Sequence, residues 1–270
     1  MNRFNPNVLL AGGLVCLAGS AKADLIGLWD FENAANPGAA TVGNDLTYNN
    51  VNGSVAAQTG PAGDGAISIG VGDSFSLNHG IAPNGGSTEY VNEYTVVYDL
   101  YLPASTDATW RSLLQTTSTP DGNDGDVFVS TSNNVGVGAI GYSTGTLAAD
   151  TWYRVVFSAD IGTAGSSFFT TVLDTAGNEV WTYEHLEQGL DGRHALYSTA
   201  NDNIVHFFAD DSGEDHEVYV STLALFDDNL TLQEARALGA PGSSVVVPEP
   251  GSLALLGLGG LMIARRRRTR

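Results

Sequence analysis

The sequence is poor in cysteine, in basic residues and in long apolar runs. Its single cysteine, Cys16, lies in an N-terminal stretch with the features of a cleavable signal, so the rest of the chain has no thiol to form a disulfide. Between Asp24 and Val247 there are 4 arginines and 29 acidic residues, which gives a net charge of −25. A field of this sign repels phosphate backbones and excludes nucleic acid as a partner. It suits solubility and the binding of cations.

No apolar run near the C-terminus is long enough for a comfortable membrane span. Residues 251–264 number 14, four of them glycine. As a helix they would reach about 21 Å, against a hydrocarbon core of about 30 Å. An ordinary single-pass tail anchor is the alternative, and the shortfall in length counts against it. The arginines that follow would stay on the cytoplasmic side, which places the rest of the chain outside.

The N-terminus predicts export. Arg3 gives a positive start, residues 8–18 form an apolar core, and Ala21 and Ala23 flank Lys22 as a small-x-small cleavage site. Residues 1–23 are therefore expected to be a signal peptide that signal peptidase removes, so that the mature chain begins at Asp24.

The extreme C-terminus resembles the bacterial PEP-CTERM sorting signal over residues 248–270. The resemblance rests on three parts in order: a Pro-Glu-Pro motif, the apolar run and an arginine cluster, which are made by Pro248, Glu249, Pro250, Arg265, Arg266, Arg267 and Arg268. It implies a Gram-negative host and a tail that contacts the inner membrane transiently before an exosortase-type enzyme cleaves it. The localisation it implies is the cell surface or the extracellular space.

Between the two signals the pattern predicts one all-β domain. About a dozen short strands are separated by Gly- and Asn-rich turns, with residues 152–158 and 167–173 as the strongest. The only helix signal is the capping box of Thr231 and Glu234, ending at Gly239. Antiparallel strands without crossover helices favour a two-sheet sandwich over residues 24–240, followed by a linker over 241–247.

Three stretches of this domain resemble the laminin-G-like, concanavalin A-like superfamily. They are residues 27–31 (Gly-Leu-Trp-Asp-Phe), 151–156 (Thr-Trp-Tyr-Arg-Val-Val) and the closing 218–239. The resemblance implies a jelly-roll sandwich that often depends on calcium and often binds glycans or proteins. It implies no particular ligand.

Residues 141–145 match the G-x-S-x-G pattern of serine hydrolases, but no helix is expected after Ser143, as that elbow requires. No strand carries alternating carboxylates of the kind that glycosidases of this fold use. The five histidines lack metal-ligand spacing. No catalytic residue is therefore predicted, and an enzyme with a catalytic pair drawn from separate strands is the alternative.

Two acidic loops are candidate calcium sites, because calcium takes six to eight oxygen ligands. The better candidate contains Asp210, Asp211, Glu214 and Asp215, and the weaker one contains Asp121, Asp124 and Asp126. A solvated acidic turn is the alternative for both. Among the four tryptophans, Trp110 follows a loop and is the candidate for stacking on a sugar, whereas Trp29, Trp152 and Trp181 lie in predicted strands and are expected in the core.

The sequence thus predicts an exported, non-catalytic module that binds a polysaccharide or a matrix protein, with calcium as its one candidate cofactor. A glycan-cleaving enzyme and a purely structural matrix component are the alternatives.

Overall fold

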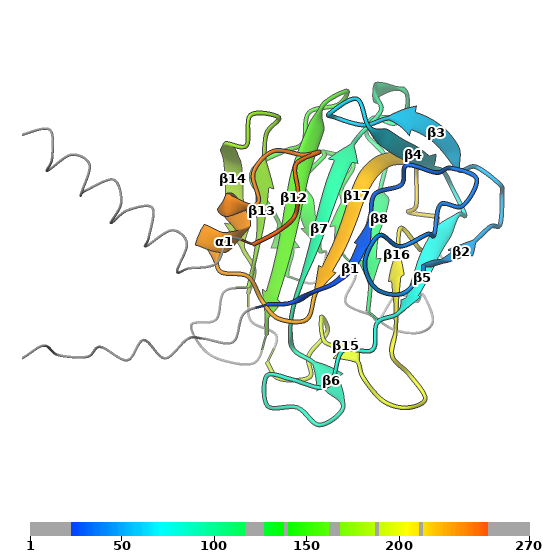
Figure 1. The fold of residues 1–270 in the computed structure, drawn as a ribbon. Coiled ribbons are helices and arrows are strands. Elements are labelled where there is room, and N and C mark those ends of the chain that lie inside the picture. Colours follow the sequence, from blue (N-terminus) through cyan, green and yellow to red (C-terminus); the bar gives the residue numbers. More distant parts are fainter. Residues whose placement is uncertain are drawn as a thin grey trace, which may run out of the picture.

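The computed structural model describes residues 23–116, 127–137, 140–161, 168–186, 189–210 and 213–247. Within them, antiparallel strands form two large sheets that face each other, as Figure 1 shows. A two-stranded sheet, β6 (Tyr90–Val91) with β15 (Leu196–Tyr197), lies apart from both. The all-β sandwich predicted from the sequence is confirmed.

Sheet A follows the order β14 (Glu179–Glu184), β13 (Phe169–Leu173), β12 (Trp152–Asp160), β7 (Glu93–Tyr101), β17 (Val218–Phe226), β4 (Gly65–Ile69) and β3 (Ala56–Thr59). Strand β1 (Leu25–Trp29) also belongs to sheet A, outside this order, and pairs with β17. Sheet B follows the order β11 (Gly141–Tyr142), β10 (Val135–Val137), β9 (Val127–Val129), β8 (Arg111–Gln115), β16 (Ile204–Phe207), β5 (Ser74–Asn78) and β2 (Thr47–Asn49).

The alternation of strand β7 explains how the core is placed. Tyr94, Val96, Tyr98 and Leu100 point between the sheets, because successive side chains of a strand face opposite sides. The two tyrosine hydroxyls are buried with their rings, and each is paired: Tyr94 donates to the His194 carbonyl at 2.8 Å and Tyr98 to the Leu113 carbonyl at 3.1 Å. The inner face is therefore apolar without leaving these hydroxyls unsatisfied.

Short helices join this framework at two places. A 3-10 turn, η1 (Ala104–Thr106), follows β7, and α1 (Leu232–Ala237) follows β17. The predicted capping box is confirmed, because Thr231 Oγ1 accepts from the Glu234 amide at 3.3 Å and the Glu234 carboxylate accepts from the Thr231 amide at 2.9 Å. A helix of 6 residues is too short to be stable by propensity alone, so packing must hold it.

That packing occurs on the outer face of sheet A. A second hydrophobic cluster there joins the sheet to α1 and to residues 239–247, which we call the C-terminal strap. Figure 1 shows the strap (orange) leaving α1 and crossing the face of β12 and β7. Val245 and Val247 are 2% and 3% exposed. Most of the strap is the segment expected to be a linker, but its valines lie against the sandwich.

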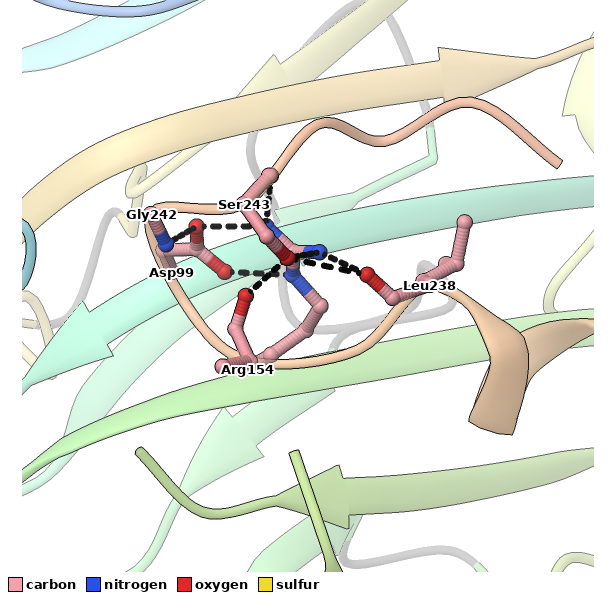
Figure 2. A network of polar contacts seen from close by, with 6 residues as sticks. Asp99, Arg154, Leu238, Gly242 and Ser243 are labelled. Carbon is pink, nitrogen blue, oxygen red and sulfur yellow. Dashed lines mark hydrogen bonds and ion pairs between the residues drawn. The ribbon is translucent and has the colours of Figure 1, made fainter. Parts of the chain in front are cut away.

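A buried ion pair fixes the strap, as Figure 2 shows. Arg154 and Asp99 lie side by side on β12 and β7 and form two parallel bonds of 2.8 Å. The guanidinium also donates to the Leu238 carbonyl at 2.6 Å and to the Ser243 carbonyl at 2.7 Å. The Gly242 amide donates to Asp99 at 2.8 Å. Charge on the sheet and carbonyls on the strap therefore satisfy each other away from water.

Within the described ranges, no helix combines the length and apolarity that a membrane crossing would need.

Candidate functional site

The outer face of sheet B carries side chains that neither hydrophobic cluster absorbs. On β9, Val127 and Val129 belong to the inner core, so Phe128 between them points outward. Gly136 pairs with Phe128, and Tyr142 pairs with Gly136. Directly paired residues share a face of a sheet. Phe128 and Tyr142 therefore lie on the same outer surface, with a residue that has no side chain between them.

Trp110 joins these two rings to form what we call the aromatic group (Trp110, Phe128 and Tyr142). Its indole lies 6.1 Å from the Phe128 ring, nearly perpendicular at 82°, and 5.7 Å from the Tyr142 ring. Trp110 and Tyr142 are only partly buried. The sequence-based expectation that Trp110 remains accessible agrees with this position, although the indole leans on two partners and does not stand alone.

A polar row crosses the same face next to the aromatic group. Gln115 pairs with His206, and His206 pairs with Ser76. Their neighbours Leu114 and Phe207 point into the core. The row is therefore on the outer face.

Two buried side chains on β8 lack hydrogen-bond partners within the described structure. They are Gln115, whose amide oxygen and nitrogen are both unpaired, and Ser112, whose hydroxyl is unpaired. A buried polar group without a partner costs about 1–3 kcal/mol, so native proteins rarely keep one without a use. Both side chains are only 1% exposed, so an external ligand does not reach their polar atoms in this structure.

Charged groups of both signs adjoin Tyr142. Burial and the Glu214 carboxylate together raise the pKa of its hydroxyl to about 12, although the Arg193 guanidinium opposes them. Burial and the charge of Asp210 likewise raise the pKa of Glu214. At neutral pH Tyr142 is therefore a hydrogen-bond donor lying near one carboxylate and one guanidinium.

Arg193 differs from the other arginines of the described chain. Arg111 donates to the backbone carbonyls of Glu217 and Thr109, and Arg154 is held by Asp99. Arg236 forms an ion pair of 2.5 Å with Glu179. The buried Nε of Arg193 has no partner among the described residues.

The acidic loop predicted to bind calcium is divided by the fold. The Asp210 carboxylate accepts from the Glu214 amide at 2.8 Å, which closes the turn. Asp215 is buried, and its backbone forms an isolated antiparallel β-bridge with Arg111. Its carboxylate accepts from the Gly72 amide at 2.6 Å. Among the residues placed by the structure, no three side chains of His, Cys, Asp or Glu gather into a metal site. Asp211 lies outside the described residues, and calcium remains a prediction.

Other predicted sites lie outside the described ranges. They are Asp121, Asp124 and Asp126 of the weaker loop, and Ala21, Pro248, Glu249, Pro250, Arg265, Arg266, Arg267 and Arg268 of the two processing signals. Ala23, the last residue of the expected signal peptide, is 6% exposed and belongs to the same cluster as Val245 and Val247.

Ser143 of the G-x-S-x-G match is in a turn after β11. Its hydroxyl donates to the Gly145 carbonyl at 2.7 Å and accepts from the Val135 amide at 3.0 Å. No helix follows it before β12. The serine therefore holds a turn together, in agreement with the interpretation from the sequence.

The prediction that Trp152 lies in the core is wrong. Trp29 is fully buried and Trp181 packs partly against the inner core. Trp152 is on the outer face of sheet A, because its neighbour Tyr153 takes the inward position. The outer face of β12 also carries Arg154, Ser158 and Asp160, so the alternation pointed to the other face as the core, and the tryptophan was misplaced because it lies in a strand. Gln115 and His206 were not predicted as site residues, because only strand pairing brings them to one face. Arg193 was not predicted either, because it lies in a loop whose backbone contacts Thr116.

Comparisons with known proteins agree with the C-terminal sorting signal and with the β-sandwich fold. A family model described as the PEP-CTERM protein-sorting motif matches residues 246–268. The chain carries a PEP-CTERM sorting motif. No curated protein matches the sequence.

Solved structures share the fold. Domain 4 of an extracellular GH43 arabinanase from Geobacillus stearothermophilus, in complex with arabinotriose, is 17% identical, with a TM-score of 0.51 over 81% of this chain and 100% of that one. Trypanosoma rangeli sialidase in complex with sialic acid is 16% identical, with a TM-score of 0.47 over 79% of this chain and 32% of that one. The receptor-binding domain of botulinum neurotoxin type G is 11% identical, with a TM-score of 0.46 over 79% and 50%. At these identities the likeness concerns the β-sandwich fold alone, which is consistent with the expected concanavalin-like class.

The sorting motif indicates export and processing by an exosortase-type enzyme for surface association, as is typical of Gram-negative hosts.

Proposed function

We propose that the exported domain is a non-catalytic module that binds polysaccharide on the outer face of sheet B. The observation that carries the proposal is the aromatic group, whose Trp110 and Tyr142 rings are partly exposed on this face. Trp110 and Tyr142 offer ring surface on which the C–H face of a sugar can stack. The Tyr142 hydroxyl, with Glu214 and Arg193 near it, offers polar groups for sugar hydroxyls. A few placed polar groups beside aromatic surface are characteristic of small-molecule sites.

The ligand that fits this face is uncharged. Arg193 and Glu214 act on Tyr142 with opposite sign, so this face does not present a uniform charge to a ligand. The rest of the exported chain, at −25, repels polyanions. At physiological salt, charges more than about 8 Å apart are largely screened from each other, and a neutral glycan carries no charge of its own. Its affinity should therefore change little with ionic strength.

A glycan array with the processed protein, followed by affinity measurements on its best neutral ligand, tests the proposal. Trp110→Ala and Tyr142→Ala should each weaken binding at least about tenfold, which corresponds to about 1.4 kcal/mol. Tyr90→Ala, in the separate two-stranded sheet, is the aromatic control and should bind normally.

A parallel reducing-sugar assay separates the alternatives. Release of new reducing ends from a bound glycan would show a glycan-cleaving enzyme on the same fold. No binding to any glycan, with retained binding to a matrix protein or to other copies, would contradict the proposal and favour a structural role.

A further inference from the structure

Three aromatic side chains line up on the outer face of sheet A, on three adjacent strands. Trp152 of β12 pairs with Tyr101 of β7, and Tyr101 pairs with Tyr219 of β17. The Trp152 and Tyr101 rings are 5.5 Å apart, and those of Tyr101 and Tyr219 are 5.1 Å apart and nearly parallel at 7°. We call these three residues the aromatic row.

The row does not belong to either hydrophobic cluster. The neighbours that take the inward positions are core residues: Leu100, Leu102, Tyr153, Val218 and Val220. The members of the row are partly exposed. The strap covers the neighbouring part of β12 and β7, where Arg154 and Asp99 lie, and it makes its polar contacts there. Large aromatic side chains grouped on a solvent-facing sheet indicate an interaction surface.

Negative charge surrounds this surface. The Tyr101 hydroxyl donates to Asp150 at 2.9 Å, and the Ala104 amide donates to the same carboxylate oxygen at 2.9 Å. Burial, Glu217 and Asp150 all raise the pKa of Tyr219. Arg111 lies near Glu217, but its guanidinium is turned to backbone carbonyls, including that of Glu217 at 2.8 Å. The row therefore combines electron-rich rings with carboxylates in a domain whose net charge is −25.

Ring faces and carboxylates together complement a cation better than a neutral or acidic group. An ammonium ion is attracted to the face of a tyrosine or tryptophan within about 6 Å of its centre. The negative field of the domain raises the local concentration of cations. Strand spacing of about 4.8 Å carries the rings across the sheet at intervals on the scale of one sugar unit, so a polymer crossing the strands can meet all three.

We propose that the aromatic row binds a polysaccharide that bears ammonium groups, of the glucosamine type. Because Tyr101 and Tyr219 turn ring faces to each other, the sugar chain crosses the outer edges of Trp152, Tyr101 and Tyr219, and the ammonium groups are directed toward Asp150 and Glu217. The site is on the opposite sheet from the proposed neutral-glycan surface and does not depend on it.

The test compares a glucosamine hexamer with its fully N-acetylated counterpart, using the processed protein and calorimetric or fluorescence titration near pH 6. The two ligands share a backbone and differ in charge. The glucosamine hexamer should bind at least tenfold more tightly. Raising ionic strength, or raising the pH until the amines are neutral, should remove most of that difference.

Variants distinguish a built site from attraction to an acidic protein in general. The double variant Trp152→Ala with Tyr219→Ala should lower affinity for the glucosamine hexamer at least tenfold, whereas Tyr90→Ala should not. Asp150→Asn keeps an oxygen for the Tyr101 hydroxyl and removes one charge, so it should lower affinity severalfold while the fold is retained. Wild-type affinity in both the double variant and Asp150→Asn would overturn the proposal. Equal binding of the two hexamers, or binding of neither, would also overturn it.

Discussion

Arg154 and Arg193 show how differently the two outer faces of the sandwich are used. Arg154, on sheet A, makes five hydrogen bonds to Asp99, Leu238 and Ser243 and is completely buried. Arg193, near the sheet B surface, leaves its buried Nε unpaired within the described structure. Where the chain supplies its own partners, charge serves to attach the strap. Where it does not, a buried polar atom is left unsatisfied.

The cost of burial makes the comparison informative. Taking a charge out of water is expensive, and the pair on sheet A offsets this cost with near-ideal geometry and extra hydrogen bonds. Gln115 and Ser112 on sheet B have no such compensation from the described chain. Sheet A should therefore lose stability when its buried ion pair is changed, and sheet B should lose binding when the partly exposed rings of Trp110 and Tyr142 are changed.

The largest expected effect is on sheet A. Arg154→Met leaves Asp99 buried without its partner, which should destabilise the domain by about 3–5 kcal/mol. Thermal unfolding followed by circular dichroism should show a fall of roughly 6–20 °C, at about 2–4 °C per kcal/mol for a domain of this size. The control is Arg154→Met with Asp99→Leu, which removes both charges and should recover much of the loss. A single variant within about 1 kcal/mol of wild type would show that the strap does not depend on this pair.

Calcium is the next test, because it would give sheet B a charge partner from outside the chain. Calcium at about a hundredfold above its dissociation constant stabilises the folded state by about 2.7 kcal/mol, or about 5–11 °C. Glu214→Gln should abolish that rise if the acidic loop is the site. Identical melting curves in calcium and in chelator would leave the loop as a solvated turn.

The strap should respond locally to a smaller change. Val247→Ser loses the burial of an apolar side chain, worth about 1.5–3 kcal/mol when complete. Hydrogen exchange should accelerate in the strap and α1 but not in β7 or β17. Val246→Ser is the matched control, because Val246 is 64% exposed.

The same variant bears on tail processing. Val247 directly precedes Pro248, so a docked strap holds the chain beside the expected cleavage motif. In a pulse-chase experiment in the native host, Val247→Ser should be processed faster than wild type, and Val246→Ser at the wild-type rate. Equal rates for all three proteins would show that docking does not limit cleavage.

The smallest effect concerns Glu214 and pH. Burial and Asp210 raise its pKa in the folded state, so the charged form opposes folding above that pKa and the opposition fades as the pH falls. Glu214→Gln should therefore melt slightly above wild type at pH 7, and the difference should shrink toward pH 4. A difference that is constant with pH would exclude titration of Glu214 as its cause.

The sequence by itself determined the elements that depend on local patterns. The patterns of residues 152–158 and 167–173 predicted β12 and β13, and Thr231 with Glu234 predicted the start of α1, because periodicity and capping act within a few residues. The Pro-Glu-Pro motif and its arginine cluster could also be identified from the sequence alone, because a sorting signal is one contiguous stretch of the chain.

Only the tertiary structure decided which face of each strand meets solvent and which distant residues share a surface. Trp152 looked like a core residue because it lies in a strand, and the position of the other sheet decides which face of that strand is the core. Val245 and Val247 looked like linker, although their cluster includes Val97, Val156 and Phe169 of sheet A, all more than 70 residues away in sequence. Gln115 and His206 are 91 positions apart, and only the pairing of β8 with β16 places them side by side. Such contacts depend on strand order, which local propensity does not encode.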